Sequence, residues 1–161
     1  MDEPLEDEAV TTIAWDGKTL ASDSLGDQNG LRMPTIKLHR GVLTDKVPFI
    51  IGISGQNSWA HMLYNWVKTL DTMGVCQARY PDQDSENDPT AIIVLGQHKI
   101  AFFKTGPVWI RLERKYHAVG SGRDYAIMAM RLGKTSKEAV KLACEFDVYS
   151  GGEIRTMEIP K

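Results

Sequence analysis

The alternation of apolar and polar positions predicts an ordered domain of short strands and three helices. Apolar residues recur with the i, i+3, i+4, i+7 spacing over residues 58–70, so this segment should be a helix with one face against a core. Residues 48–53 are continuously apolar and β-branched, which is typical of a strand covered on both faces. Asp16 and Gly17 separate two alternating segments and predict a tight hairpin.

The order of the predicted elements favours an α+β fold. Besides 48–53 and 58–70, we expect strands at 11–15, 18–22, 91–95, 100–103, 117–119 and 153–159 and helices at 123–132 and 136–146. Thr135 and Glu138 have the spacing of a capping box before the last helix. The order lacks the regular βαβ alternation of a Rossmann or barrel fold, so helices covering two antiparallel sheets fit better.

Charge and composition exclude several functional classes. The 161 residues contain 19 Lys and Arg against 21 Asp and Glu, so the chain has no basic footprint for nucleic acid or an anionic membrane. The longest apolar run, 48–53, is far shorter than the roughly 20 residues that span a bilayer. Two cysteines without a secretory leader indicate a reducing compartment, and we expect the cytoplasm.

Two segments are strongly biased in composition. Residues 1–10 hold five acids and no base, and we expect them to form a disordered tail or a propeptide ahead of a single domain at 11–161. Residues 79–89 carry alternating acids but lack the glycine and the final Glu of a calcium loop, which favours a solvated loop.

Generic catalytic and metal motifs are absent from the sequence. The four histidines lack metal-ligand spacing, so neither a metal nor a cofactor is expected. Gly120-Ser121-Gly122 precedes a predicted helix and could offer backbone N–H groups to an anion, which by itself is a weak signal.

Six short motifs occur in an informative order. They are Thr11-Thr12-Ile13, Ala21-Ser22-Asp23-Ser24, Ile36-Lys37, Gly52-Ile53-Ser54-Gly55, Gly120-Ser121-Gly122 and Asp147-Val148-Tyr149-Ser150-Gly151-Gly152. Together they resemble the proteasome β-subunit family, in particular HslV-type peptidases and their small bacterial and phage relatives. The resemblance covers residues 11–159 and implies the N-terminal-nucleophile hydrolase sandwich, with two antiparallel sheets between helical layers. It also implies that one helical layer is reduced, because a loop follows helix 58–70 where the family has a longer helical pair.

The resemblance assigns a role to seven residues. Matched motif by motif, the implied catalytic set is Thr11, Asp23, Lys37, Gly55, Ser121, Asp147 and Ser150. Thr11 matches the nucleophile, Asp23 and Lys37 its charged neighbours, and Gly55 the oxyanion-hole glycine. The other three match residues around the threonine's amine. Each residue taken singly also has an ordinary structural explanation, such as a strand, a turn or a solvated lysine.

The chemistry of an N-terminal threonine explains this residue set. A free α-amine with a pKa of about 8 can take the proton of its own hydroxyl, directly or through a water. A neighbouring ammonium lowers the proton affinity of that amine, and a backbone N–H stabilises the oxyanion. The implied reaction is amide hydrolysis through an acyl-enzyme ester.

The resemblance implies a threonine-type peptidase that acts on peptides or unfolded proteins. It also implies a homo-oligomeric ring fed by an ATP-dependent unfoldase. The exposed side of helix 58–70 could form the ring contact, or its aromatic residues could be satisfied within the core. The alternative is an inactive structural subunit in which residues 1–10 block Thr11. Three origins of these residues stay open: translation starting at Val10, a propeptide, or a permanent tail.

Overall fold

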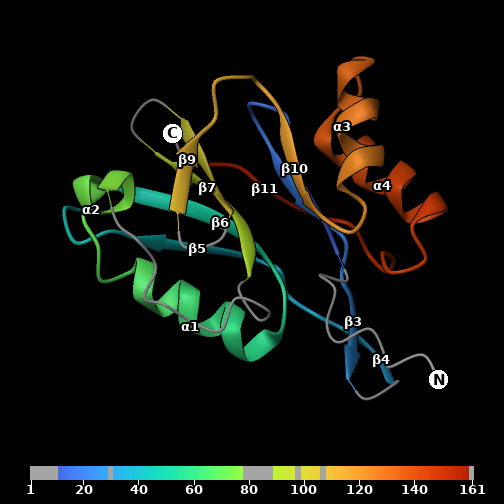
Figure 1. Cartoon of the computed structure of the whole chain (residues 1–161), viewed down its shortest axis with the longest axis horizontal. Helices are drawn as coiled ribbons and strands as arrows, with labels where there is room; N and C mark the ends of the chain where they lie inside the picture. The colour runs from blue at the N-terminus through green and yellow to red at the C-terminus, as the bar shows by residue number, and fades with distance from the viewer. Residues whose placement is uncertain (1–10, 29–30, 78–88, 97–98, 106–107, 160–161) are drawn as a thin grey trace.

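Two antiparallel sheets lie face to face between two layers of helices (Figure 1). The computed structural model describes residues 11–28, 31–77, 89–96, 99–105 and 108–159. The tail expected at 1–10 and nearly all of the loop expected at 79–89 lie outside the described residues. The layered arrangement confirms the α+β sandwich that the sequence predicts.

The first sheet carries the start of the ordered domain. Its strand order is β10 (His117–Gly120), β1 (Thr12–Trp15), β2 (Leu20–Ser22) and β11 (Arg155–Met157). The outer face of this sheet is covered by α3 (Arg123–Arg131) and α4 (Ser136–Phe146). A core of small residues, mostly alanine, separates this sheet from these helices, so the helices approach the strands closely.

The second sheet is built around the strand predicted at 48–53. Its order is β5 (Leu38–Val42), β6 (Pro48–Ser54), β7 (Thr90–Leu95), β8 (Ile100–Thr105) and β9 (Val108–Arg111). Along β6, Phe49 and Ile51 face a core that also contains residues of α1 (Asn57–Val67) and α2 (Thr72–Gln77). Ile50, one position along, faces the first sheet. The central strand is therefore covered on both faces, as its composition predicts.

Local signals in the sequence are confirmed at two turns. Asp16 Oδ1 accepts hydrogen bonds from the backbone nitrogens of Lys18 and Thr19, and Gly17 has a φ of +93° in the hairpin between β1 and β2. At the start of α4, Thr135 Oγ1 accepts from the backbone nitrogen of Glu138, 3.2 Å away.

The structure corrects the sequence predictions in the regions of weakest pattern. A second, short helix, α2, follows α1, so the prediction of a single helix in this layer is wrong. The sequence analysis also missed β5, β9 and the hairpin of β3 (Leu25–Gln28) and β4 (Leu31–Pro34). Every residue of β4 is exposed, so the hairpin lacks the apolar face that a pattern detects. The expected strand 153–159 is shorter, at 155–157.

The connection between the two sheets brings the ends of β1, β2 and β5 together. The chain enters β1 at Thr12, leaves β2 at Ser22, and crosses through the β3–β4 hairpin to β5 at Leu38. Residues just outside these strands therefore gather at one end of the sandwich. In the part of the chain that the structure describes, no helix is long and apolar enough to cross a membrane.

Candidate active site

Thr11 lies at the edge of the first sheet where β1 begins, one residue before that strand. Its neighbour Thr12 pairs with Gly120 of β10, and the backbone nitrogen of Asp23 donates to the Thr12 carbonyl oxygen, 3.2 Å away. The Thr11 side chain is buried, with an exposed fraction of 1%. Two polar clusters meet at this residue, one on the side of its hydroxyl and one on the side of its nitrogen.

The first group, which we call the Asp23 cluster, consists of Asp23 and Lys37. Oδ1 of Asp23 accepts from Thr11 Oγ1 at 2.9 Å, from the Thr12 nitrogen at 3.0 Å and from Lys37 Nζ at 2.9 Å. Oδ2 accepts from the backbone nitrogens of Gly151 and Leu25. Asp23 has no exposed surface, and a buried carboxylate is costly unless it is paired and hydrogen-bonded. These donors supply that compensation.

Lys37 places a positive charge beside the threonine hydroxyl. Its side chain is buried, and its Nζ and Thr11 Oγ1 share the same oxygen of Asp23. Burial lowers the pKa of Lys37 below its ordinary value of 10.5, while the charge of Asp23 opposes that shift. The lysine is therefore held by an ion pair in a site that water does not stabilise.

The second group, which we call the Asp147 cluster, consists of Asp147, Ser121, Ser150 and Thr12. Asp147 Oδ2 accepts from the hydroxyls of Ser121 and Ser150, each at 2.6 Å. Ser121 Oγ lies 3.1 Å from both the nitrogen and the carbonyl oxygen of Thr11. A serine hydroxyl has one proton, and the short bond to a carboxylate takes it. Ser121 therefore presents a lone pair to the Thr11 nitrogen.

The same argument, that a serine hydroxyl has one proton, gives the direction of the hydrogen bond between Thr12 and Ser150. Ser150 gives its proton to Asp147, so in the 2.7 Å contact between Thr12 Oγ1 and Ser150 Oγ the threonine is the donor. Thr12 is a site residue that the sequence analysis missed. Its hydroxyl lies against Gly122, where an added β-carbon would come 3.2 Å from Thr12 Cβ. A β-branched residue in a strand gives no signal of such a role.

Gly55 belongs to neither hydrogen-bonded cluster. It follows β6 with a φ of +141°, a backbone conformation that favours glycine. Among the hydrogen bonds of the described residues, none joins Gly55 to Thr11. Six of the seven implied site residues thus form one hydrogen-bonded network. The seventh, Gly55, follows β6, in which the nitrogen of Ile53 donates to the carbonyl oxygen of Lys37 at 3.0 Å.

Other groups near the site are candidates for a reactive or binding role. Burial raises the pKa of the Cys144 thiol to about 11, with the charge of Asp23 acting in the same direction, so this thiol stays protonated at neutral pH. Within the described residues, no group of three or more His, Cys, Asp or Glu is placed to hold a metal. The Gly122 N–H, a candidate anion donor, instead donates to the Thr11 carbonyl oxygen at 3.2 Å.

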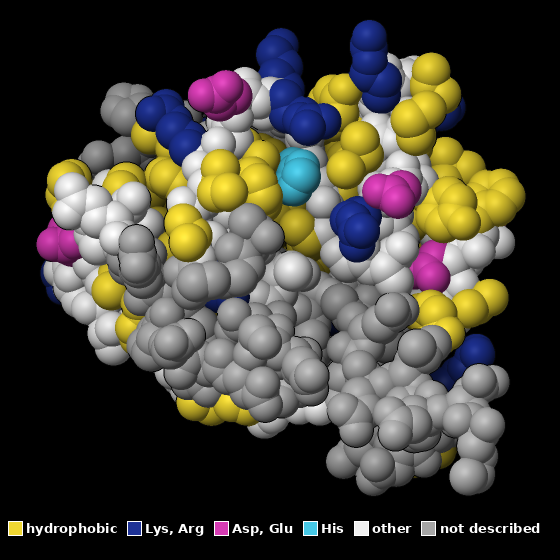
Figure 2. Space-filling model, viewed as in Figure 1, with side chains coloured by type: hydrophobic (Ala, Val, Ile, Leu, Met, Phe, Trp, Pro, Cys, Tyr) yellow, Lys and Arg dark blue, Asp and Glu magenta, His cyan; other side chains and the backbone are white. Residues whose placement is uncertain are grey.

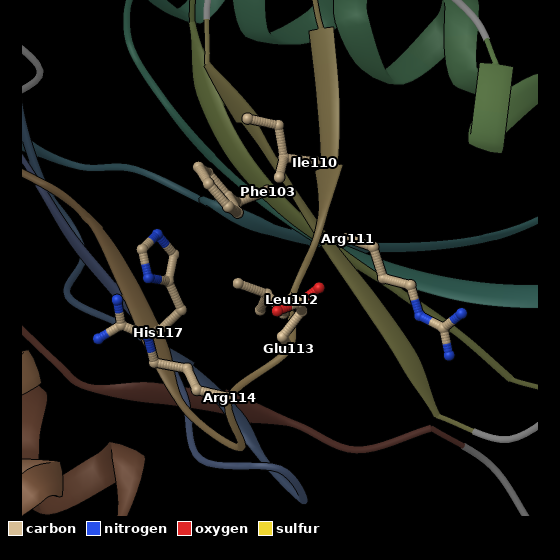
Figure 3. Close-up of a pocket in the computed structure, with 7 residues that line it drawn as sticks. All are labelled: Phe103, Ile110, Arg111, Leu112, Glu113, Arg114 and His117. Carbon is tan, nitrogen blue, oxygen red and sulfur yellow. The ribbon is translucent and has the colours of Figure 1, made fainter.

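A shallow pocket lies at the other end of β10 from Thr11. Figure 3 shows residues that line it, among them Phe103, Leu112 and His117 and the charged Glu113 and Arg114. His117 pairs with Trp15, whereas Gly120, at the other end of the strand, pairs with Thr12. Thr11 is not among the residues that line this pocket, so the polar network and the pocket are separate features of the structure.

Solved structures with the same arrangement of layers are proteasome-like proteins. BPH from Thiobacillus denitrificans, solved in complex with epoxomicin, matches with a TM-score of 0.64 at 20% identity, covering 94% of this chain and 99% of that one. HslV from Trypanosoma brucei matches with a TM-score of 0.66 at 20% identity, covering 92% and 99%. Anbu from Yersinia bercovieri matches with a TM-score of 0.71 at 12% identity, covering 93% and 81%.

The chain has a proteasome-like fold. The resemblance drawn from the six sequence motifs is therefore confirmed for the fold. No protein-family model matches the sequence, and no curated protein matches it. In this proteasome-like fold, Thr11, Asp23 and Lys37 come together from three strand ends, which is the grouping that the motif order implies.

Proposed function

We propose that the protein is a threonine-type peptidase that cleaves peptide bonds through an acyl-enzyme on Thr11. The observation that supports this most strongly is the sharing of one Asp23 oxygen by the Thr11 hydroxyl and the Lys37 ammonium. A structural threonine has no need of a buried ion pair at its hydroxyl. The proteasome-like fold adds support, because its neighbours include HslV and an epoxomicin complex of BPH.

The first step forms the acyl-enzyme. Thr11 Oγ1 attacks the carbonyl carbon of the scissile amide, and its proton passes to the free α-amine of the same residue. The π electrons of the carbonyl move onto its oxygen, and the N–H of Gly55 stabilises the resulting oxyanion. The C–N bond then breaks, and the leaving amine takes the proton from the Thr11 ammonium. The product is an ester between Thr11 and the acyl half of the substrate.

The second step frees the enzyme. A water loses its proton to the Thr11 amine and attacks the ester carbonyl, and collapse of the second oxyanion releases a carboxylic acid. The proton returns to Thr11 Oγ1. The two clusters act on the amine that moves these protons: Lys37 disfavours its protonated form by like charge, and Ser121 orients its nitrogen.

The mechanism requires a free amine at Thr11, so we propose that the active form begins at this residue. An amide nitrogen has no available lone pair, and it cannot serve as the base. Translation from Val10 followed by removal of the initiator, or cleavage of a propeptide, would each give this form. Intact-mass measurement during expression from the gene's own start region separates them, because only a propeptide shows a longer precursor chased into the product.

We also propose a homo-oligomer that degrades peptides or unfolded proteins in the cytoplasm with an ATP-dependent unfoldase. A structure of Anbu from Pseudomonas aeruginosa is a helical assembly. In α1, Tyr64 and Trp66 pack partly into the core, whereas Met62 is exposed. Apolar side chains also gather over α3 and α4 (Figure 2), where Tyr125, Met128 and Phe146 are exposed, and Val148 is exposed just after the end of α4. Light scattering should give a mass well above 18 kDa.

The activity is tested with three proteins. They are a chain that begins at Thr11, released from a cleavable fusion, the full chain of residues 1–161, and Thr11→Ala in the first form. The free-threonine protein should hydrolyse fluorogenic peptide amides. The Thr11→Ala variant should be slower by about 10³-fold or more. Equal turnover by all three would contradict the assignment, and inactivity of every form would favour an inactive proteasome-like subunit.

A further inference from the structure

Lys104 is a second buried lysine near the site, and the mechanism above does not use it. Its side chain lies in β8 with an exposed fraction of 1%, on the same strand face as Phe102 of the core beneath α1 and α2. Its Nζ donates to the carbonyl oxygen of Pro89 at 2.9 Å. Burial of an ammonium is costly unless it is paired or hydrogen-bonded, so the groups that Lys104 contacts bear on its role.

Pro89 is the residue that faces Gly55 across the ends of two strands. The last pair of the β6–β7 ladder is Ser54 with Thr90, so Gly55 and Pro89 come next in register. A β-carbon added to Gly55 would lie 3.2 Å from both Cα and Cβ of Pro89. Pro89 therefore packs directly on the glycine.

A proline at this position leaves the end of the ladder weakly held. Pro89 has no N–H to donate across to β6, so the backbone cannot fix this pair from that side. On the other edge of β6, Ile53 is anchored, because its nitrogen donates to the Lys37 carbonyl oxygen at 3.0 Å. The hydrogen bond from Lys104 to the Pro89 carbonyl anchors the opposite side.

We infer that Lys104 is a positioning residue for the Gly55 N–H, acting through Pro89. This inference rests on the proposed function in so far as Gly55 is the oxyanion donor, but the mechanical link from Lys104 to Gly55 stands apart from it. An oxyanion donor that moves by a fraction of an ångström loses much of its effect. The Lys104 ammonium holds the Pro89 carbonyl through a hydrogen bond, and the Pro89 ring packs on Gly55.

The mechanical link is tested by hydrogen–deuterium exchange in the full chain. Lys104→Met keeps the length of the side chain and removes the donor. Exchange in peptides that cover residues 53–57 should rise by about 10-fold, because local opening of this strand end becomes easier. Phe102→Leu, on the same face of β8, is the matched control and should leave exchange at 53–57 unchanged relative to other strands.

The catalytic consequence is measured with the form that begins at Thr11. Lys104→Met should lower kcat by about 10-fold with KM within about twofold, and the pH profile should keep its shape because the Thr11 amine is untouched. The melting temperature should fall moderately, because the substitution removes a buried hydrogen bond. A purely structural role would instead raise exchange throughout the chain rather than at residues 53–57.

Each outcome decides a separate claim. Unchanged exchange at residues 53–57 in Lys104→Met overturns the inference, whether or not the protein is a peptidase. Raised exchange at 53–57 in a protein whose wild type is inactive supports the positioning role and overturns the proposed function alone. Lys104→Gln, which keeps an N–H donor, should retain more activity than Lys104→Met, and it serves as the test if the methionine variant does not fold.

Discussion

The two clusters that meet at Thr11 differ in charge and in what they hold. The Asp23 cluster pairs a carboxylate with an ammonium and contacts the threonine hydroxyl. The Asp147 cluster has a carboxylate but no basic group, and it reaches the threonine nitrogen through Ser121. A free amine at Thr11 would therefore lie between a cation that disfavours its protonation and an anion that favours it. We therefore expect the pKa of a free Thr11 amine to depend on the opposing charges of Lys37 and Asp147.

The largest effect on this balance should come from Lys37→Met. Removal of the positive charge raises the pKa of the Thr11 amine and leaves Asp23 without its partner. We expect kcat/KM to fall by about 10²- to 10³-fold at pH 7, with the acidic limb of the pH profile moved to higher pH. Lys141→Met on the exposed face of α4 is the control. An unmoved acidic limb would show that Lys37 does not tune the amine.

A smaller effect of opposite sign is expected for Asp147→Asn. Loss of the negative charge lowers the pKa of the amine, so the acidic limb should move to lower pH. Oδ1 of Asp147 accepts from the Tyr149 nitrogen and Oδ2 from two serines, and an amide cannot accept at both positions. The lost orientation should lower kcat/KM by about 10- to 100-fold. A shift in the same direction as that of Lys37→Met would show that the two charges do not have opposite effects on the pKa of the amine.

Thr12→Val tests the outer part of the Asp147 cluster. Valine keeps the shape of the side chain and removes the donor to Ser150. We expect kcat to fall by about 3- to 10-fold with KM unchanged, since this hydroxyl reaches Asp147 only through Ser150. The same substitution at Thr19, whose hydroxyl donates to exposed Glu158, should have no effect on turnover.

The smallest effect concerns stability and distinguishes burial from ion pairing at Lys37. Its folded-state pKa is lowered by burial, so between that value and the unfolded value of 10.5 the unfolded chain binds more protons. The lysine's contribution to stability is therefore complete above 10.5 and is lost as pH falls through the folded pKa. The free energy of unfolding of the wild type, relative to Lys37→Met, should rise as pH increases toward 10.5 in urea titrations. A falling difference would mean that the ion pair with Asp23 outweighs burial.

The sequence predicted best where a local pattern has a physical cause within a few residues. The apolar run of β6, the Asp16-Gly17 hairpin and the Thr135 capping box each appear as expected. The β3–β4 hairpin could not be predicted in this way, because its strand β4 is exposed throughout. The five predicted residues around Thr11 came, like Thr11 itself, from the order of motifs rather than from periodicity. Their contacts span up to 138 positions in the chain, as between Ser150 and Thr12.

Two further features could not be found from the sequence because they depend on side chains meeting across strands. Thr12 looks like any β-branched strand residue until its hydroxyl is seen to donate to Ser150. Lys104 looks like a solvated lysine at the end of a short strand until its burial and its bond to Pro89 are known. In both cases the partner is distant in sequence, and no local pattern encodes it.

The central claim, that Thr11 is the nucleophile when its amine is free, is tested most directly by covalent labelling. The chain that begins at Thr11 and the full chain of residues 1–161 are each incubated with an epoxyketone such as epoxomicin, and the adduct is located by mass spectrometry. The account predicts one stoichiometric adduct on Thr11 in the first protein and none in the second, with labelling abolished by Thr11→Ala. An adduct on another residue, or the absence of any adduct on a folded chain that begins at Thr11, would contradict it.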